Sequence, residues 1–156
     1  MFKQKPSYTI IFDLVNVIFS LNPEKIGTAE QYQLIPGMGI LLHQLASQVT
    51  QVGQKRHQLY ILSNANTESY ANYMTHHANI FSYFDGIVIS GYSGLQKPDN
   101  RAYINIIEKY DLDPKLCLFI DDKAANVHAA QAVGMHGIIF TNADNLINKL
   151  ASLDIL

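Results

Sequence analysis

Five short, continuous apolar runs alternate with longer helical patterns along this chain, and this order restricts its fold more than any other feature. Continuous apolar runs of this kind are typical of strands buried on both faces of a parallel sheet. They occupy residues 8–12, 59–62, 86–89, 116–120 and 137–140. Patterns with helical spacing separate them, at residues 38–52, 67–76, 101–110, 123–133 and 144–151. The alternation predicts a three-layer α/β/α domain around a mainly parallel five-stranded sheet.

Chain length and charge narrow the class of protein. At 156 residues the chain is expected to form a single domain, residues 1–156. Its one cysteine, Cys117, excludes a disulfide framework and a zinc site built on several thiolates. The balance of 11 Lys and Arg against 13 Asp and Glu argues against a broad basic face for nucleic acid. No stretch approaches the ~20 apolar residues of a membrane span, so we expect a cytoplasmic protein with neither a membrane nor a nucleic-acid partner.

Chemically versatile side chains stand where three of the strands should end. In parallel α/β folds, ligands bind beyond the carboxyl ends of the strands. Carboxylates follow the first and fourth runs, a Ser-Asn pair follows the second, and a lysine precedes the helical pattern at 101–110. The candidate site residues are therefore Asp13, Ser63, Asn64, Lys97, Asp121 and Asp122.

Each carboxylate has a structural alternative. Asp13 could cap a helix or lie in a surface turn, but the β-branched Val15 and Val17 make a helix start unfavourable there. A carboxylate at the edge of a core is costly unless it is paired or bound to a cation. One of Asp121 and Asp122 could cap the next helix, which leaves the other unexplained. A divalent cation would relieve the repulsion between the two, so we favour a metal site.

The Ser-Asn pair and the lysine are weaker signals when taken alone. Ser63 and Asn64 suit an ordinary turn before a helix, and a loop lysine such as Lys97 is usually solvated. The alternative is a phosphate site, in which a hydroxyl, an exposed backbone N–H and an ammonium hold the phosphate oxygens.

The order and spacing of the four segments resemble the haloacid dehalogenase-like (HAD) hydrolase superfamily. The segments read IIFDLVNVIF, LYILSNAN, GLQKPDNRAY and LFIDDKAANVHAAQAVGM. The similarity extends over about residues 8–141 and is closest to the subgroup that reads FDxxxVL…SN…KP…DDxxxN. It implies a Rossmann-like HAD core and a hydrolase, with a phosphorylated substrate as the first expectation.

The resemblance also implies how the carboxylates act. Asp13 would be the nucleophile that attacks phosphorus and forms an aspartyl-phosphate. Mg²⁺ would be the cofactor, held by the Asp13 carboxylate, the Val15 carbonyl and Asp122. Asp121 would support the same metal site, through water.

The other motif residues would hold the substrate. Ser63 would donate a hydrogen bond to the phosphoryl group, helped by the backbone of Asn64. Lys97 would neutralise Asp13 and the transferred oxygens. Asn126 would order the loop that carries the acidic pair.

Val15 departs from the family pattern, because most HAD phosphatases carry an Asp two residues after the nucleophile. That Asp protonates the leaving group and then activates water, and its loss would cost ~10²–10⁴ in rate. The first hypothesis is therefore a Mg²⁺-dependent phosphatase with weakened acid–base catalysis, suited to a good leaving group such as an acyl or anomeric phosphate. His76, His77 and His128 are candidates to replace the missing base.

Two other functions stay open at this point. A catalytically impaired HAD domain could act as a binding or interaction protein. A 2-haloacid dehalogenase needs no acid, because a halide leaves without a proton. Dehalogenases of the family use a cap-region arginine, however, and here no arginine precedes Arg56.

The chain lacks room for a substantial cap domain, since only residues 22–35 lie between the first motif and the next helical pattern. An open site suits a macromolecular phosphorylated substrate, or closure by a second copy of the chain. The aromatic residues that could line such a homodimer contact are Tyr8, Phe19, Tyr32, Tyr83 and Tyr92.

Overall fold

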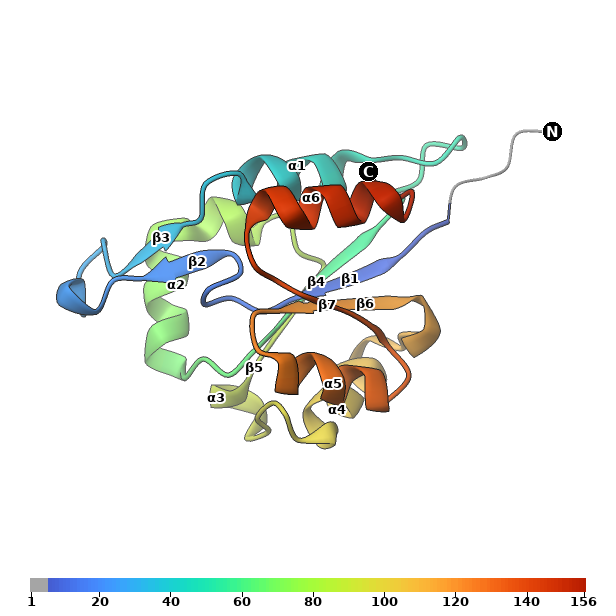
Figure 1. Ribbon diagram of the computed structural model, residues 1–156. Helices are drawn as coiled ribbons and strands as arrows, with labels where there is room; N and C mark the ends of the chain where they lie inside the picture. The colour runs from blue at the N-terminus through green and yellow to red at the C-terminus, as the bar shows by residue number, and fades with distance from the viewer. Residues whose placement is uncertain (1–5) are drawn as a thin grey trace.

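A five-stranded parallel sheet forms the middle of the computed structural model, which describes residues 6–156 (Figure 1). The strand order is β5-β4-β1-β6-β7, and every neighbouring pair is parallel. The strands are β1 (Thr9–Phe12), β4 (Gln58–Ser63), β5 (Gly86–Ile89), β6 (Cys117–Asp121) and β7 (His136–Ile139). The predicted strands and the three-layer fold are confirmed, and β1 lies at the centre of the sheet.

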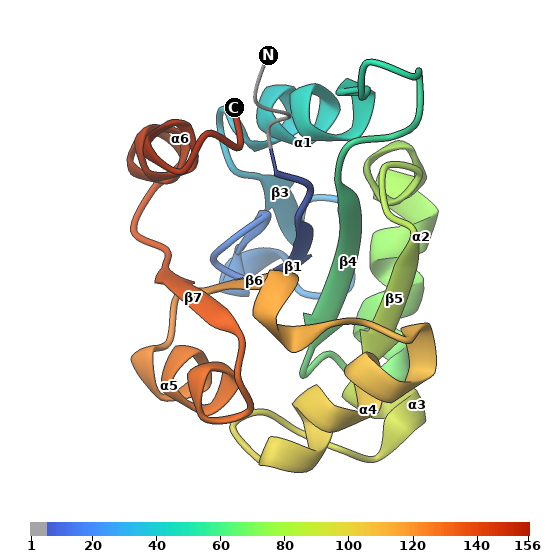
Figure 2. The same ribbon diagram turned by 90° about the vertical axis from the view of Figure 1, so that its right-hand side faces the viewer.

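Helices cover both faces of the sheet, so the molecule has three layers (Figures 1 and 2). One face carries α1 (Met38–Ser47), α2 (Thr67–Phe81) and α6 (Ala143–Ser152). The other carries α4 (Asn100–Tyr110) and α5 (Ala124–Ala132), with the short α3 (Ser90–Ser93) beside them. The pleat of β1 divides its side chains between the two cores: Ile10 and Phe12 pack under α1 and α6, and Ile11 packs on the α4 side.

Two helix ends differ from the prediction. The first helix was predicted to reach residue 52, but α1 ends at Ser47 because Gln48 is extended and Val49 pairs with Lys55 in a bridge. Val49 therefore continues the helical spacing of apolar residues in the sequence, but it lies outside the helix and its side chain is exposed. In contrast, α2 continues beyond the predicted residue 76 and bends at His77, whose φ is −134°.

A small antiparallel hairpin occupies the segment in which the sequence predicted no regular structure. Its strands are β2 (Phe19–Leu21) and β3 (Tyr32–Leu34), with the short 3-10 helix η1 (Pro23–Lys25) between them. The hairpin projects beyond the sheet on the side of α2 (Figure 1). The expectation that the chain has no substantial cap domain is confirmed, because this hairpin is all that the segment forms.

The aromatic residues predicted to line a contact between copies do not form one surface. Phe19 and Tyr32 are buried in the chain's own core, so these two residues do not line a contact between copies. Tyr92 is largely exposed, and Tyr8 and Tyr83 are half-buried.

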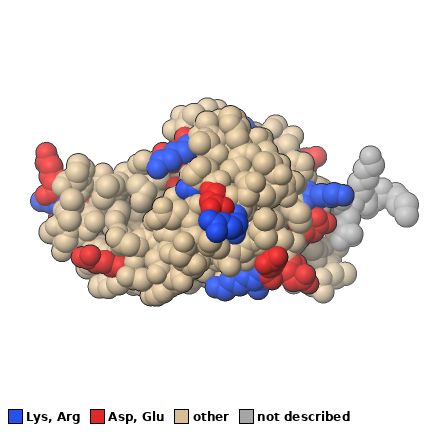
Figure 3. Space-filling model, turned by 90° about the horizontal axis from the view of Figure 1, so that it is seen from below, with Lys and Arg blue, Asp and Glu red and all other residues tan. Residues whose placement is uncertain are grey.

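On the face formed by α4 and α5, basic and acidic side chains are interspersed (Figure 3). Among residues 6–156, no helix is both long enough and apolar enough to cross a membrane.

Candidate functional site

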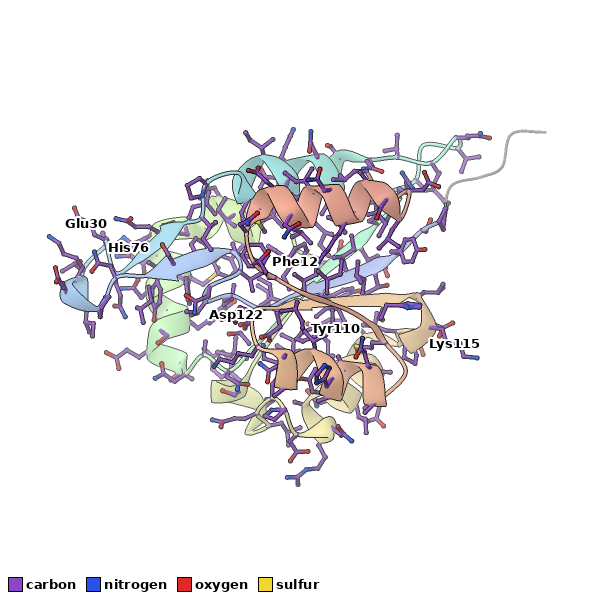
Figure 4. The ribbon with its side chains drawn as sticks, in the orientation of Figure 1. Phe12, Glu30, His76, Tyr110, Lys115 and Asp122 are labelled. Atoms are coloured by element: carbon purple, nitrogen blue, oxygen red, sulfur yellow. The ribbon has the colours of Figure 1, made fainter. Side chains whose placement is uncertain are left out.

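The carboxyl ends of β1, β4 and β6 bring the predicted site residues together. Asp13 directly follows β1, and its backbone N–H donates to the carbonyl of Ile120 at 2.9 Å, which joins the ends of β1 and β6. Ser63 ends β4, and Asp121 ends β6. Figure 4 shows Asp122 at this edge of the sheet, on the side of the hairpin. Residues separated by up to 109 positions in sequence thus meet because their strands are neighbours.

Lys97 is the cation at the centre of this cluster. Its Nζ lies 2.8 Å from Asp13 Oδ1 and 2.7 Å from Asp121 Oδ2, and its side chain is buried. Burial raises the pKa of Asp13, the charge of Lys97 opposes this, and the charge of Asp121 adds to it.

The three carboxylates could hold a divalent cation. Asp13, Asp121 and Asp122 each offer an oxygen, and these oxygens lie within 4.8 Å of one another. Against the single charge of Lys97, three carboxylates leave two negative charges. Asp122 Oδ1 is buried and has no hydrogen-bond partner among the described groups, although its other oxygen accepts from Asn16 Nδ2 at 3.3 Å. A free, buried carboxylate oxygen beside excess negative charge fits an Mg²⁺ ion.

Both oxygens of Asp121 accept hydrogen bonds within the protein. Oδ1 accepts the backbone N–H of Lys123 at 2.9 Å, and Oδ2 accepts from both Lys97 and Asn126 Nδ2. Asn126 is in turn held by the hydroxyl of Tyr103, which donates to its carbonyl at 2.8 Å. This network orients the acidic pair, and it leaves Asp122, rather than Asp121, with an oxygen that accepts no hydrogen bond.

The side chain of Asn64 positions the loop that carries Lys97. Its Oδ1 accepts the N–H of Lys97 at 2.8 Å, and its Nδ2 donates to the carbonyl of Lys97 at 2.9 Å. Ser63 is buried, and its Oγ accepts the N–H of Ala65 at 3.2 Å, so its hydroxyl proton is free to point at an anion. The two hydrogen bonds between the side chain of Asn64 and the backbone of Lys97 join two of the motifs, and they were not evident from the sequence.

Four residues of the cluster, Asp13, Ser63, Asn64 and Asp122, line a cavity of about 550 Å³. Val15 is half-buried in the cavity wall, and its hydrocarbon side chain offers no proton. Sequence reasoning missed much of the remaining wall, because these residues come from separate elements and share no motif. The missed lining residues are Asn16, Tyr32, Asn66, Ser69, Tyr73, Ser90, Gln96 and Lys123.

The predicted histidine replacements for the base do not reach the cavity. His77 lies outside its lining and uses Nε2 to bond the carbonyl of Tyr32 at 2.8 Å. His128 is exposed on α5 and borders a different pocket. His76 is exposed on α2, away from the cavity lining (Figure 4). The prediction of a histidine base is therefore wrong for all three.

Comparison with known proteins finds relatives whose names describe a hydrolase and a phosphatase. The chain is 30% identical over 124 residues to the chloroplast flavin mononucleotide hydrolase 1 of Arabidopsis thaliana, which covers 80% of this chain and 47% of the relative. It is 43% identical over 60 residues to a sesquiterpene phosphatase of Aspergillus oryzae, covering 38% of this chain and 31% of that protein. The chain thus spans less than half the length of these curated relatives.

A solved structure shares the fold. A HAD family enzyme of Bacteroides thetaiotaomicron, crystallised with magnesium and inorganic phosphate, superposes with a TM-score of 0.70 at 16% identity, covering 87% of this chain and 95% of that one. The family model for haloacid dehalogenase-like hydrolases matches residues 17–134. By this match, and by the arrangement of its sheet, the chain belongs to the haloacid dehalogenase-like hydrolases.

Proposed function

We propose that this protein is a Mg²⁺-dependent phosphatase that works through an aspartyl-phosphate on Asp13. The observation that carries the proposal is the buried group of Asp13, Lys97 and Asp121 beside the free oxygen of Asp122. Two relatives named as a flavin mononucleotide hydrolase and a sesquiterpene phosphatase support it, as does a neighbour that was crystallised with magnesium and phosphate. We also propose that residues 1–156 form one HAD core unit.

Each residue of the group has a distinct part in this proposal. The Asp13 carboxylate attacks phosphorus while Lys97 holds it in place and balances its charge. Ser63 and the backbone of Asn64 bind the phosphoryl oxygens. Mg²⁺ would be held by Asp13, Asp122 and the carbonyl of Val15, where it would offset the repulsion between two anions. The remaining residue of the acidic pair, Asp121, keeps Lys97 in place.

The wall of the cavity favours a small substrate with a good leaving group. A volume of about 550 Å³ falls in the range of small-molecule sites, so we favour a small phosphorylated molecule over a macromolecule. Val15 cannot protonate a departing oxygen, and the amide of Asn16 is engaged with Asp122. An acyl or anomeric phosphate meets this limitation, because its leaving group needs little protonation. No arginine lines the described cavity, which argues against a haloacid substrate.

The proposal is tested by phosphate release from para-nitrophenyl phosphate, acetyl phosphate and a sugar 1-phosphate, with and without Mg²⁺. We expect Mg²⁺-dependent release that Asp13→Asn abolishes. The matched control is Asp144→Asn, which removes the same charge from an exposed carboxylate in the first turn of α6 and should keep full activity. Release that is unchanged in Asp13→Asn would refute the proposal, and the absence of release from every substrate would favour a binding protein.

Val15→Asp tests the account of the missing acid. If protonation of the leaving group limits the rate, this variant should hydrolyse alkyl phosphates at least 10-fold faster, within the ~10²–10⁴ that a general acid contributes. A folded Val15→Asp variant with unchanged rates would show that another step is limiting.

A further inference from the structure

The hydroxyl of Tyr73 is a buried donor that the fold itself leaves unused. Tyr73 lies on α2, is fully buried, and lines the same cavity as Asp13. Its phenol oxygen has no hydrogen-bond partner within 3.5 Å among the described groups, and only a weaker side-chain interaction with Tyr32 is present. Burying a hydroxyl without a partner is unfavourable, and replacing this tyrosine by phenylalanine would avoid the cost without changing the ring.

Neighbouring aromatic rings hold the side chain of Tyr73 in one orientation. The ring of Tyr32, from β3, stacks on it with centroids 4.1 Å apart. The rings of Phe19 and Phe81 lie 5.1 Å and 6.0 Å from it. This packing joins α2 to the hairpin and surrounds the ring, and the buried hydroxyl is the polar group of a side chain that lines the cavity.

Two buried atoms without partners belong to residues of this cavity wall, and they have opposite chemistry. Asp122 Oδ1 is an acceptor and suits a cation. The Tyr73 hydroxyl is a donor and suits an oxygen of the substrate. Tyr73 also lies on the side of Val15, because Val15 pairs with Phe19 in an isolated bridge and Phe19 contacts the Tyr73 ring. The unused donor thus lines the same cavity as the residue that cannot supply a proton.

The geometry of in-line transfer indicates which oxygen this donor meets. Asp13 and Ser63 line the cavity, and Lys97 pairs with Asp13 without lining the cavity itself. These three residues account for the nucleophile and the phosphoryl oxygens. An attacking oxygen and a leaving oxygen stand on opposite sides of phosphorus. The leaving oxygen therefore points away from Asp13, toward other residues that line the cavity.

We propose that Tyr73 is a catalytic residue, whose hydroxyl donates a hydrogen bond to the leaving-group oxygen of the phosphorylated substrate. This inference rests on the proposed phosphatase function. As the bond from Asp13 to phosphorus forms, the ester bond from phosphorus to the leaving oxygen breaks, and that oxygen gains charge. Tyr73 stabilises the charge and keeps its own proton, and the leaving group then takes a proton from water.

The surroundings of Tyr73 suit a donor that does not ionise. Burial raises the pKa of Tyr73 far above its ordinary value, and the neighbouring Tyr32 and Asp13 add to the shift. Burial therefore favours the protonated form of the hydroxyl. Tyr73 strengthens the departure of a leaving group by hydrogen bonding, but it does not replace the water-activating base that Val15 lacks.

The test compares Tyr73→Phe with the unchanged protein on a series of aryl phosphates of similar size, from para-nitrophenyl to para-methylphenyl phosphate. A hydrogen bond to the leaving oxygen matters most when that oxygen is most basic. We expect kcat/KM to fall about 10- to 100-fold for para-methylphenyl phosphate and less than about 3-fold for para-nitrophenyl phosphate. Inhibition by inorganic phosphate, which has no leaving group, should be unchanged.

The control is Tyr60→Phe, because Tyr60 is a buried tyrosine on the opposite face of the sheet, outside the cavity. Tyr60→Phe should leave kcat/KM unchanged for both substrates, and thermal unfolding verifies that both variants are folded. An equal loss on all aryl phosphates, or no loss, would overturn the role of Tyr73 while Asp13-dependent release still supports the phosphatase. If the unchanged protein releases no more phosphate than Asp13→Asn from any member of the series, the proposed function fails, and this inference fails with it.

Discussion

Replacing Lys97 by methionine removes the positive charge that pairs with both Asp13 and Asp121. Methionine has a similar length, so the change deletes the ammonium with little change in packing. The Nζ of Lys97 is within 2.8 Å of both Asp13 and Asp121, and only 4% of the residue is exposed. In Lys97→Met, two neighbouring buried carboxylates would face each other without a cation.

The expected loss of stability follows from this burial. Removing one partner of a buried ion pair costs about 3–5 kcal/mol, because it leaves an uncompensated buried charge. We expect the lower end, about 3 kcal/mol, because Asp121 keeps its bonds from Asn126 and from the N–H of Lys123. For a domain of this size such a loss lowers Tm by about 6–12 °C.

The assay is urea unfolding followed by circular dichroism, in the presence of a chelator so that no bound cation replaces the lysine. The control is Lys115→Met, since Lys115 is exposed and points away from the sheet at its far end (Figure 4). Its free energy of unfolding should change by less than about 0.5 kcal/mol. Adding Asp121→Asn to Lys97→Met should recover part of the loss, because it removes the repulsion.

The loss in Lys97→Met should also depend on pH. The pKa of Asp13 is already raised by burial, and loss of the lysine removes the charge that opposes this. A carboxyl whose folded-state pKa lies above its unfolded value stabilises the protein at low pH and loses that contribution as pH rises. The deficit should therefore be larger at pH 8 than at pH 5. A deficit below about 1 kcal/mol, or one that is the same at both pH values, would refute the electrostatic reasoning.

Two predictions concern parts of the fold outside the cavity. Burial, followed by the charge of Arg56, lowers the pKa of His57 from 6.5 to about 4, so the unfolded chain binds more protons between these values. The free energy of unfolding, measured in urea, should therefore fall by about 2 kcal/mol from pH 7 to pH 5. If the His57→Gln variant shows the same fall, His57 is not its cause. Gly86→Ala should cost about 1–3 kcal/mol, because its Cβ would come within 2.7 Å of Tyr110 Cε1; unchanged thermal unfolding would disprove the clash.

The strands were the part of the fold best predicted from sequence. Strands buried on both faces consist of apolar residues, so each run was visible as a continuous block and its end was correct to within one residue. The hairpin of β2 and β3 was not predicted, because its strands have three residues each and alternate with polar positions. It is stabilised by contacts of Phe19 and Tyr32 with Tyr73 of α2, which are distant in sequence.

The candidate site shows the same division. The sequence by itself determined which residue types stand at the ends of β1, β4 and β6, because a strand end is a local feature and parallel strands bring their carboxyl ends to one edge. It also determined that the position of Val15 carries no acid. Only the tertiary structure decided that both oxygens of Asp121 accept hydrogen bonds while one oxygen of Asp122 accepts none, and that the hydroxyl of Tyr73 has no partner within 3.5 Å. Whether a polar atom is satisfied depends on groups from other elements, and these meet only when the chain is folded.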